Sequence, residues 1–248
     1  MSPLLNDDTM EDLKTASNYG FSAVKIDELG APEYTLVTVA QDVSGSVYEY
    51  ADEMESCIKT ILESCQKSPR AENLMLRLLA FNDRLDEVHG FRLLNTVNAS
   101  DYDKIINPDG GTALFDAVQS AVEATKDYGE ILHDQDFGVN AIVFIVTDGD
   151  DNSSRASAAS VKRAVTDAMR SEKLESITVV LVGVGEDSYV KTYLDQFQQD
   201  AGITQFISIG DATPSKLAKL ANFISRSISS TSQALSNGVD ASSNLLTF

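Results

Sequence analysis

The chain has 248 residues, of which 43% are hydrophobic and 23% are charged, and its formal net charge is −19. This composition predicts a globular protein with a full hydrophobic core in one or two domains. The negative charge argues against nucleic acid and anionic membranes as partners, because both are bound by clustered Lys and Arg. A cation or a basic protein surface is the expected complement.

Hydropathy, the N-terminal residues and the cysteines indicate which cellular compartment to expect for the protein. No apolar run reaches the roughly 18 residues that a membrane-spanning helix needs. Residues 1–8 lack a basic region followed by an apolar stretch, so we expect no secretory signal. Cys57 and Cys65 fall on one predicted helix, about 12 Å apart, which is too far for a disulfide. We therefore expect two core thiols and a cytoplasmic protein.

The chain opens with a lead-in of mixed character, residues 1–33, which we treat as an N-terminal arm. Within it, residues 9–12 (Thr-Met-Glu-Asp) predict the cap of a short helix that ends near Ser17. The apolar run 34–40 then predicts the first strand of the main domain. Apolar side chains at helical spacing follow over 47–66.

The rest of the chain alternates between the two periodicities. Strands are predicted at 74–81, 87–94, 141–146, 177–184 and 206–209, and helices at 114–122, 161–169, 188–197 and 214–228. The alternation predicts a doubly wound α/β domain over 34–228, with a mainly parallel sheet and helices on both faces. The short connection before 87–94 makes that segment an antiparallel edge strand. The Ser-rich residues 229–248 are predicted to be a disordered tail.

Oxygen-bearing side chains gather in three loops of this pattern. They are Asp42, Ser44 and Ser46 after the first strand, Thr112 before a helix, and Asp148 after the strand 141–146. In an open parallel sheet, ligands bind at the edge formed by the carboxyl ends of the strands. Carboxylates and hydroxyls are hard donors, which suit Mg²⁺, Mn²⁺ or Ca²⁺ better than zinc or copper.

Each of these residues also has a purely structural interpretation. Ser46 and Thr112 are acceptable helix N-caps, and Asp148 with Gly149 is an ordinary turn pair. Taken singly, such interpretations are favoured. Five oxygen-bearing residues at one sheet edge are poorly explained by independent caps. The acidic segment 150–152 reads first as a solvated loop, with a second cation site as the alternative.

The sequence from 34 to 230 resembles a von Willebrand factor type A (vWA) domain. The pattern Asp-x-Ser-x-Ser, then Thr, then Asp resembles the metal-ion-dependent adhesion site (MIDAS) of that family. All its elements are present, namely Asp42, Ser44, Ser46, Thr112 and Asp148. The flanking Gly-Gly-Thr-Ala-Leu and Phe-Ile-Val-Thr-Asp-Gly stretches match as well.

The resemblance implies how this site would act. Ser44 and Ser46 would bind the metal directly, whereas Thr112 and the two aspartates would bind it directly or through water. One coordination position would remain for an Asp or Glu of a protein partner. The implied function is therefore a metal-dependent protein-binding module rather than an enzyme.

Two further expectations concern the kind of protein. Within the vWA family, the chain is most similar to intracellular bacterial or phage members, including those associated with tellurite resistance, which serve as adaptors. The alternative is a Mg²⁺-dependent phosphatase-like hydrolase, since a carboxylate at a strand end also describes that class. This alternative is disfavoured because Ser44 occupies the position at which that class has a second Asp. His89 and His133 show no metal-ligand spacing.

Overall fold

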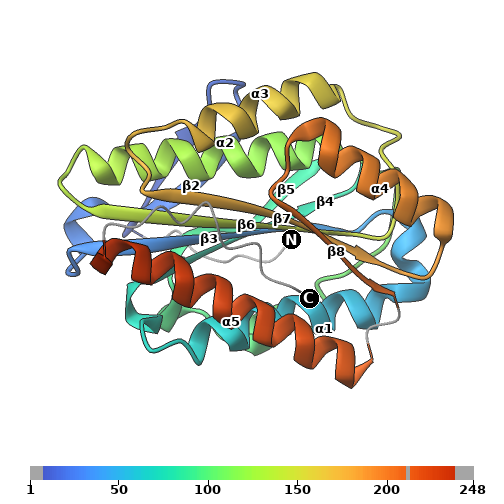
Figure 1. The fold of residues 1–248 in the computed structure, drawn as a ribbon, viewed down its shortest axis with the longest axis horizontal. Helices are drawn as coiled ribbons and strands as arrows, with labels where there is room; N and C mark the ends of the chain where they lie inside the picture. Colours follow the sequence, from blue (N-terminus) through green and yellow to red (C-terminus); the bar gives the residue numbers. More distant parts are fainter. Residues whose placement is uncertain (1–7, 211–212, 238–248) are drawn as a thin grey trace.

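The computed structural model describes residues 8–210 and 213–237. At its centre lies an eight-stranded sheet in the order β1-β2-β5-β4-β3-β6-β7-β8 (Figure 1). The strands are β1 Met10–Lys14, β2 Gly20–Val24, β3 Glu33–Asp42, β4 Leu74–Phe81, β5 Leu85–Leu93, β6 Gly138–Thr147, β7 Ser176–Val184 and β8 Gln205–Gly210. The helices are α1 Ala51–Gln66, α2 Leu114–His133, α3 Ala158–Met169, α4 Ser188–Ala201 and α5 Pro214–Asn237.

The middle of the sheet is parallel. Strand β3 pairs with β4 on one side and β6 on the other, and β7 and β8 continue the parallel run. This arrangement confirms the predicted mainly parallel α/β fold. Strand β5 is antiparallel to β4, as expected, but it does not lie at the edge, because β2 pairs with its other side.

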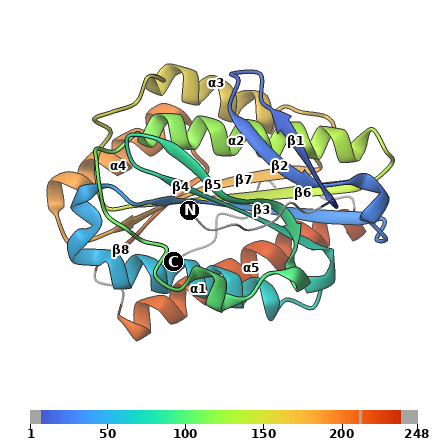
Figure 2. The same cartoon turned by 180° about the vertical axis from the view of Figure 1, so that it is seen from behind.

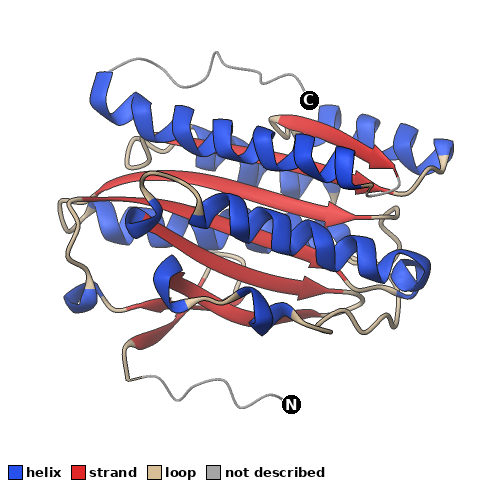
Figure 3. Ribbon diagram, turned by 90° about the horizontal axis from the view of Figure 1, so that it is seen from below, coloured by secondary structure: helices blue, strands red, loops and turns tan. Residues whose placement is uncertain are grey.

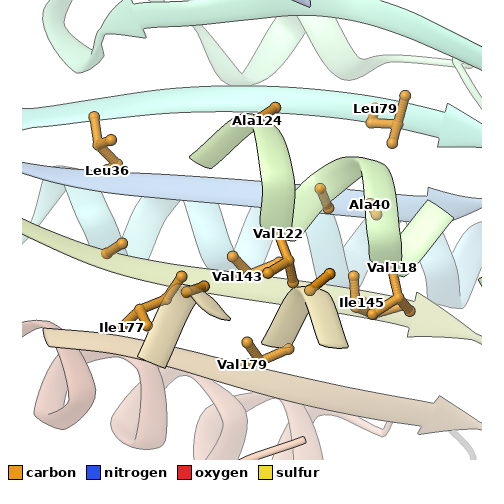
Figure 4. Packing of buried hydrophobic residues seen from close by; sticks show 14 of the residues in the cluster. Leu36, Ala40, Leu79, Val118, Val122, Ala124, Val143, Ile145, Ile177 and Val179 are labelled. Atoms are coloured by element: carbon orange, nitrogen blue, oxygen red, sulfur yellow. The ribbon is translucent and has the colours of Figure 1, made fainter. Parts of the chain in front are cut away.

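Helices α2, α3 and α4 cover one face of the sheet, and α1 and α5 cover the other (Figure 1). Figure 3 views the sheet from the side of α1 and α5. Side chains of β3 alternate between the two cores, with Leu36 and Ala40 facing α2, and Val37 and Val39 facing α1 and α5. Figure 4 shows the first of these cores. A central strand buried on both faces reads as a continuous apolar run, which explains why it was predictable.

The N-terminal arm differs from its prediction. Instead of a short helix near residues 9–17, it forms the antiparallel β1-β2 hairpin. Phe21 and Val24 are buried in the core beneath α2. Strand β2 comes so close to Gly90 that a side chain there would overlap the Ser22 carbonyl. The helical prediction was wrong because a tertiary partner, β5, offered the segment a sheet edge.

The C-terminal helix also differs, since α5 continues to Asn237, beyond the expected end at 228. Residues 229–237, predicted as part of a disordered tail, are therefore helical. No Gly or Pro occurs between Ser225 and Asn237 to end the helix. The remainder of the predicted tail, 238–248, lies outside the described residues. No helix in the described part of the chain has the length and apolar character that a membrane crossing requires.

Candidate metal centre

Two aspartates meet at the carboxyl edge of the sheet because of strand pairing. Strands β3 and β6 are parallel neighbours with Gln41 opposite Val146. Asp42 is the last residue of β3, and Asp148 follows directly after β6. Both carboxylates are therefore delivered to the same place. Asp42 is fully buried and Asp148 is only 7% exposed.

A chain of hydrogen bonds connects the first loop to Asp148. The backbone N–H of Ser44 donates to Asp42 Oδ1 at 2.8 Å, which fixes the start of the loop. Ser46 Oγ donates to Asp148 Oδ1 at 2.9 Å and lies 3.1 Å from Ser44 Oγ. Because a hydroxyl has one hydrogen, Ser44 must be the donor to Ser46. The predicted residues Ser44, Ser46 and Asp148 are thus in direct contact.

Thr147 completes the support of Asp42. Its buried hydroxyl donates to Asp42 Oδ2 at 2.6 Å and accepts from the Gly149 N–H at 3.2 Å. Both oxygens of Asp42 are consequently held in place. This role of Thr147 was not predicted from the sequence. Its one signal was a polar residue at the end of an otherwise apolar strand.

Thr112 reaches the same place from a third loop. The backbone of Gly45 donates to the Gly110 carbonyl at 3.0 Å, which ties this loop to the first one. Gly149 lies close to the hydroxyls of both Ser46 and Thr112. A β-carbon added there would lie 3.6 Å from Ser46 Oγ and 3.9 Å from Thr112 Oγ1. All five predicted residues therefore converge on one position.

The helix-cap interpretation of the hydroxyls is wrong. Helix α1 is preceded by a 3₁₀ helix, Gly45–Tyr50, and has Tyr50 at its N-cap. Helix α2 has Ala113 at its N-cap, and neither α-helix receives a side-chain cap hydrogen bond. Ser46 and Thr112 therefore do not serve as helix N-caps.

Two side chains of the segment 150–152 make contacts that were not predicted from the sequence. Asp151 Oδ1 accepts from the Phe115 N–H at 3.2 Å. Asn152 Oδ1 accepts from the Thr112 N–H at 2.8 Å. These side chains fasten the loop after Asp148 to the first turn of α2. The segment is thus tied to neighbouring residues, while Asn152 itself is solvent-exposed, as predicted for this loop.

The electrostatics of the site favour a bound cation. The pKa of Asp42 is raised to about 6, mainly because the carboxylate is buried. The charge of Asp148 raises this pKa further, whereas hydrogen bonds from Thr147 and Ser44 lower it. Burial also raises the pKa of Asp148. Among the described residues, no basic side chain forms an ion pair with either carboxylate. Buried carboxylates without a cationic partner are costly, and a hard cation would remove that cost.

The donor set is unusual in containing few carboxylates. Nowhere in residues 8–210 and 213–237 does a group of three or more His, Cys, Asp and Glu side chains come together to hold a metal. Two carboxylates alone do not fill the coordination shell of such an ion, and the hydroxyls of Ser44, Ser46 and Thr112 are in reach as further oxygen donors. Ser46 is solvent-exposed, so the site is open to an incoming group.

The histidines and cysteines lie elsewhere. His89 Nε2 lies 2.7 Å from Tyr102 Oη, and its Nδ1 lies 2.9 Å from the Gly90 carbonyl oxygen, so both ring nitrogens have protein partners. Cys57 and Cys65 are free and buried, which confirms the prediction of two core thiols.

Comparison with known proteins places these observations in context. The von Willebrand factor type A domain family matches residues 37–223 of the chain. This span contains all five predicted residues and excludes the β1-β2 hairpin. No match was found among curated proteins.

Several solved structures share the fold. A mutant of the PilB minor pilin from Streptococcus sanguinis aligns with a TM-score of 0.60 and 14% identity, over 87% of this chain and 66% of its own. Proximal thread matrix protein 1 from the mussel byssus, in a structure with a zinc-occupied MIDAS motif, has a TM-score of 0.53 and 16% identity, over 77% and 46%. The pilus adhesin SpaC from Lactobacillus rhamnosus GG has a TM-score of 0.54 and 16% identity, over 90% and 33%.

The chain thus spans about two thirds of the pilin and less than half of the byssus protein. At these identities, the likeness concerns the fold alone.

Proposed function

The chain belongs to the von Willebrand factor type A family, and from this premise we propose that it is a metal-dependent protein-binding module. In the proposal, one divalent cation is held by Asp42, Ser44, Ser46, Thr112 and Asp148. When bound, the cation supplies Lewis-acid affinity for an Asp or Glu side chain of a partner protein. Domains of this family are typically adhesion or protein-binding modules and usually non-catalytic.

One observation carries the proposal. Three hydroxyls that cap no α-helix meet two buried carboxylates that lack any cationic partner among the described residues. Without an ion such a cluster is costly, because each carboxylate loses solvation free energy and the two repel one another. A cation accounts for all five side chains together.

The residues of the chain have distinct tasks in this site. Ser44 N–H and Thr147 orient the two oxygens of Asp42. Ser46 and Asp148, which share a hydrogen bond, provide a neighbouring pair of oxygens. Mg²⁺ is the first choice of ion, with Mn²⁺ and Ca²⁺ as alternatives, because all donors are hard oxygens. With only two carboxylates, the ion remains electron-poor and attracts an acidic side chain.

The cellular setting forms part of the proposal. We place the protein in the cytoplasm as an adaptor, similar to intracellular bacterial or phage members linked to tellurite resistance. Its support is that Cys57 and Cys65 are unpaired thiols, as is usual in a reducing compartment. Localisation of a tagged chain in its host tests this part separately.

Metal titration tests the site. Isothermal titration calorimetry with Mg²⁺ and Mn²⁺ should show one site, and saturating metal should raise the melting temperature by mass action. The Asp42→Ala, Asp148→Ala double variant should lose both effects. A matched control, Asp86→Ala with Asp195→Ala, removes the same charge from exposed positions and should keep them. Equal responses of the two double variants would refute the site.

Two further assays test the function itself. Capture of proteins from a host lysate should occur in Mg²⁺ and be lost in chelator and in the Asp42→Ala, Asp148→Ala variant. Incubation with a generic phosphomonoester and Mg²⁺ should give no phosphate release. Release that disappears in the same variant would favour the hydrolase instead.

A further inference from the structure

The β1-β2 hairpin lies outside the span that matches the family, yet it reaches the neighbourhood of the metal centre. It packs beside α2 at one side of the sheet (Figure 2). Its inner part belongs to the core, where Phe21 packs edge-on against Phe91 at 6.4 Å between ring centroids. Backbone pairing of β2 with β5 is limited to Ala23 opposite Phe91. Side-chain contacts must therefore hold the outer part of the hairpin.

The turn between β1 and β2 is docked on α2 through Ser17, which contacts Gln119 and Glu123, and through Tyr19. Ser17 Oγ donates to Glu123 Oε1 at 2.7 Å. Tyr19 Oη donates to Asp116 Oδ1 at 2.9 Å. Glu123 lies further along α2, away from the metal centre, whereas Asp116 lies in the first turn, next to it. Ser17 and Tyr19 thus fasten the same turn to different positions along α2.

Asp116 also holds the loop that follows Asp148. Its Oδ1 accepts from the Ala156 N–H at 2.9 Å, and its Oδ2 accepts from the Arg155 N–H at 3.0 Å. Its own backbone N–H donates to Ser154 Oγ at 3.0 Å. The end of the loop is therefore tied to α2 mainly through this one residue.

The start of the same loop is tied to the backbone of Thr112. Asn152 accepts from the Thr112 N–H, and its own N–H donates to the Thr112 carbonyl at 3.0 Å. Between Thr147 and Ala158 the chain forms no helix or strand. Its path, and with it the spacing between Asp148 and Thr112, depends on these hydrogen bonds together with those of Asp151 to Phe115 and Tyr193.

We propose that the β1-β2 hairpin is a positioning element for the metal centre. Tyr19, acting through Asp116, holds the loop 148–157 in the shape that brings Asp148 and Thr112 together. The inference rests on the proposed function, because it concerns the affinity of the same site. Since coupling between two sites is reciprocal, metal binding must also stabilise the docked turn. A partner that displaced the turn would lower metal affinity.

The first test is the Tyr19→Phe variant, which keeps the ring and removes the hydroxyl. Its dissociation constant for Mn²⁺ or Mg²⁺, measured by calorimetry well below the melting temperature, should rise about three- to tenfold. This is less than the full effect of one hydrogen bond to a charged acceptor, because Tyr19 acts on the site only through Asp116. The matched control is Ser17→Ala, which removes the side-chain contacts of the same turn with Glu123 and Gln119. It should bind metal as the wild type does.

The second test uses reciprocity. Hydrogen exchange of the backbone amides in the turn around Tyr19 should slow when the wild type binds Mg²⁺. The same metal concentration should have no effect on that turn in the Asp42→Ala, Asp148→Ala variant, which lacks the site. This readout is independent of the substitution at Tyr19.

The outcomes separate the inference from the proposed function. A wild type that binds neither Mg²⁺ nor Mn²⁺ overturns both. Normal metal binding with equal affinities in Tyr19→Phe and wild type overturns the inference alone. Equal losses in Tyr19→Phe and Ser17→Ala also overturn it, because general loosening of the turn would then explain the effect. Metal-dependent protection of the turn with a selective loss in Tyr19→Phe supports it.

Discussion

The hydroxyl of Thr147 donates a hydrogen bond to Oδ2 of Asp42 at 2.6 Å, between two residues that are far apart in the chain. Both are fully buried. The bond joins the ends of β6 and β3, so the strand that leads to Asp148 also orients the other carboxylate of the site. The geometry of the centre is in this way built into the sheet itself.

Removing this hydroxyl should weaken metal binding without disturbing the fold. In Thr147→Val the side chain keeps its shape, but Asp42 Oδ2 loses its donor. Loss of a partner that orients a ligand typically lowers metal affinity about 10- to 100-fold. Calorimetric titration with Mn²⁺ measures the change. Thr147→Ser retains the hydroxyl and should bind as the wild type does; equal affinities of all three proteins would show that the bond is unimportant.

Gly149 should be needed for the space it leaves. An added β-carbon would sit at ordinary contact distance from Ser46 Oγ and Thr112 Oγ1. Gly149→Ala should therefore fold with a metal-free stability within about 0.5 kcal/mol of wild type. Its methyl group would lie close to both hydroxyls, and metal affinity should fall strongly. Gly30→Ala is the control, because a β-carbon there would meet no atom of the described residues within 4 Å. Metal binding unchanged in both variants would place the ion elsewhere.

The ion pair of Arg77 with Glu87 joins the hairpin to the core. Arg77 is buried, and its Nε donates to Glu87 Oε1 at 2.7 Å, while its other guanidinium nitrogens have no hydrogen-bond partner among the residues that the structure describes. Its guanidinium carbon lies 5.9 and 6.0 Å from the ring centroids of Phe21 and Phe91. Glu87 also accepts from the Ser22 hydroxyl of β2 at 2.8 Å.

Neutralising Glu87 should therefore destabilise the protein. Breaking one partner of a buried pair leaves an uncompensated charge and costs about 3–5 kcal/mol, at the lower end here because Glu87 is 19% exposed. Urea unfolding of Glu87→Gln measures the loss. Asp86→Asn, at the exposed neighbouring position, should be close to wild type. A loss below about 1 kcal/mol in Glu87→Gln would mean that Arg77 is held mainly by the two rings.

His89 gives the protein a pH-dependent stability. Desolvation is the main cause that lowers its pKa from 6.5 to about 4. The groups that act on it besides burial are the Gly90 carbonyl and Asp101, which raise the pKa, and Arg92 and Arg77, which lower it. The folded protein therefore resists protonation of His89, whereas the unfolded chain accepts the proton near pH 6.5.

The stability contributed by a neutral His89 is complete above about pH 6.5 and is lost as the pH falls towards 4. The loss reaches at most about 3 kcal/mol. Urea unfolding of His89→Gln between these pH values should show a shallower fall than the wild type. His133→Gln, at an exposed position, should follow the wild-type curve. Parallel curves for wild type and His89→Gln would contradict the pKa shift.

Local patterns determined most of the α/β domain from sequence. In β3 a continuous apolar run, and in α1 apolar residues at helical spacing, mark the side chains that the structure buries. Both patterns can be recognised within the segment itself. The candidate site residues could be predicted for a similar reason; they are Asp42, Ser44, Ser46, Thr112 and Asp148. Their order along the chain, next to strand ends and a helix start, is a local property, and the parallel sheet gathers strand ends at one edge.

Other features were decided only by the tertiary structure, because they depend on contacts with segments of the chain that the sequence does not identify. The N-terminal arm became a hairpin because β5 offered an edge with Gly90 beneath Ser22. The role of Thr147 appears only when β6 lies beside β3, and that of Tyr19 only when the hairpin lies against α2. Such contacts join residues about 100 positions apart, so no local periodicity records them. Their free energy comes from burial and hydrogen bonds that exist only after the chain has folded.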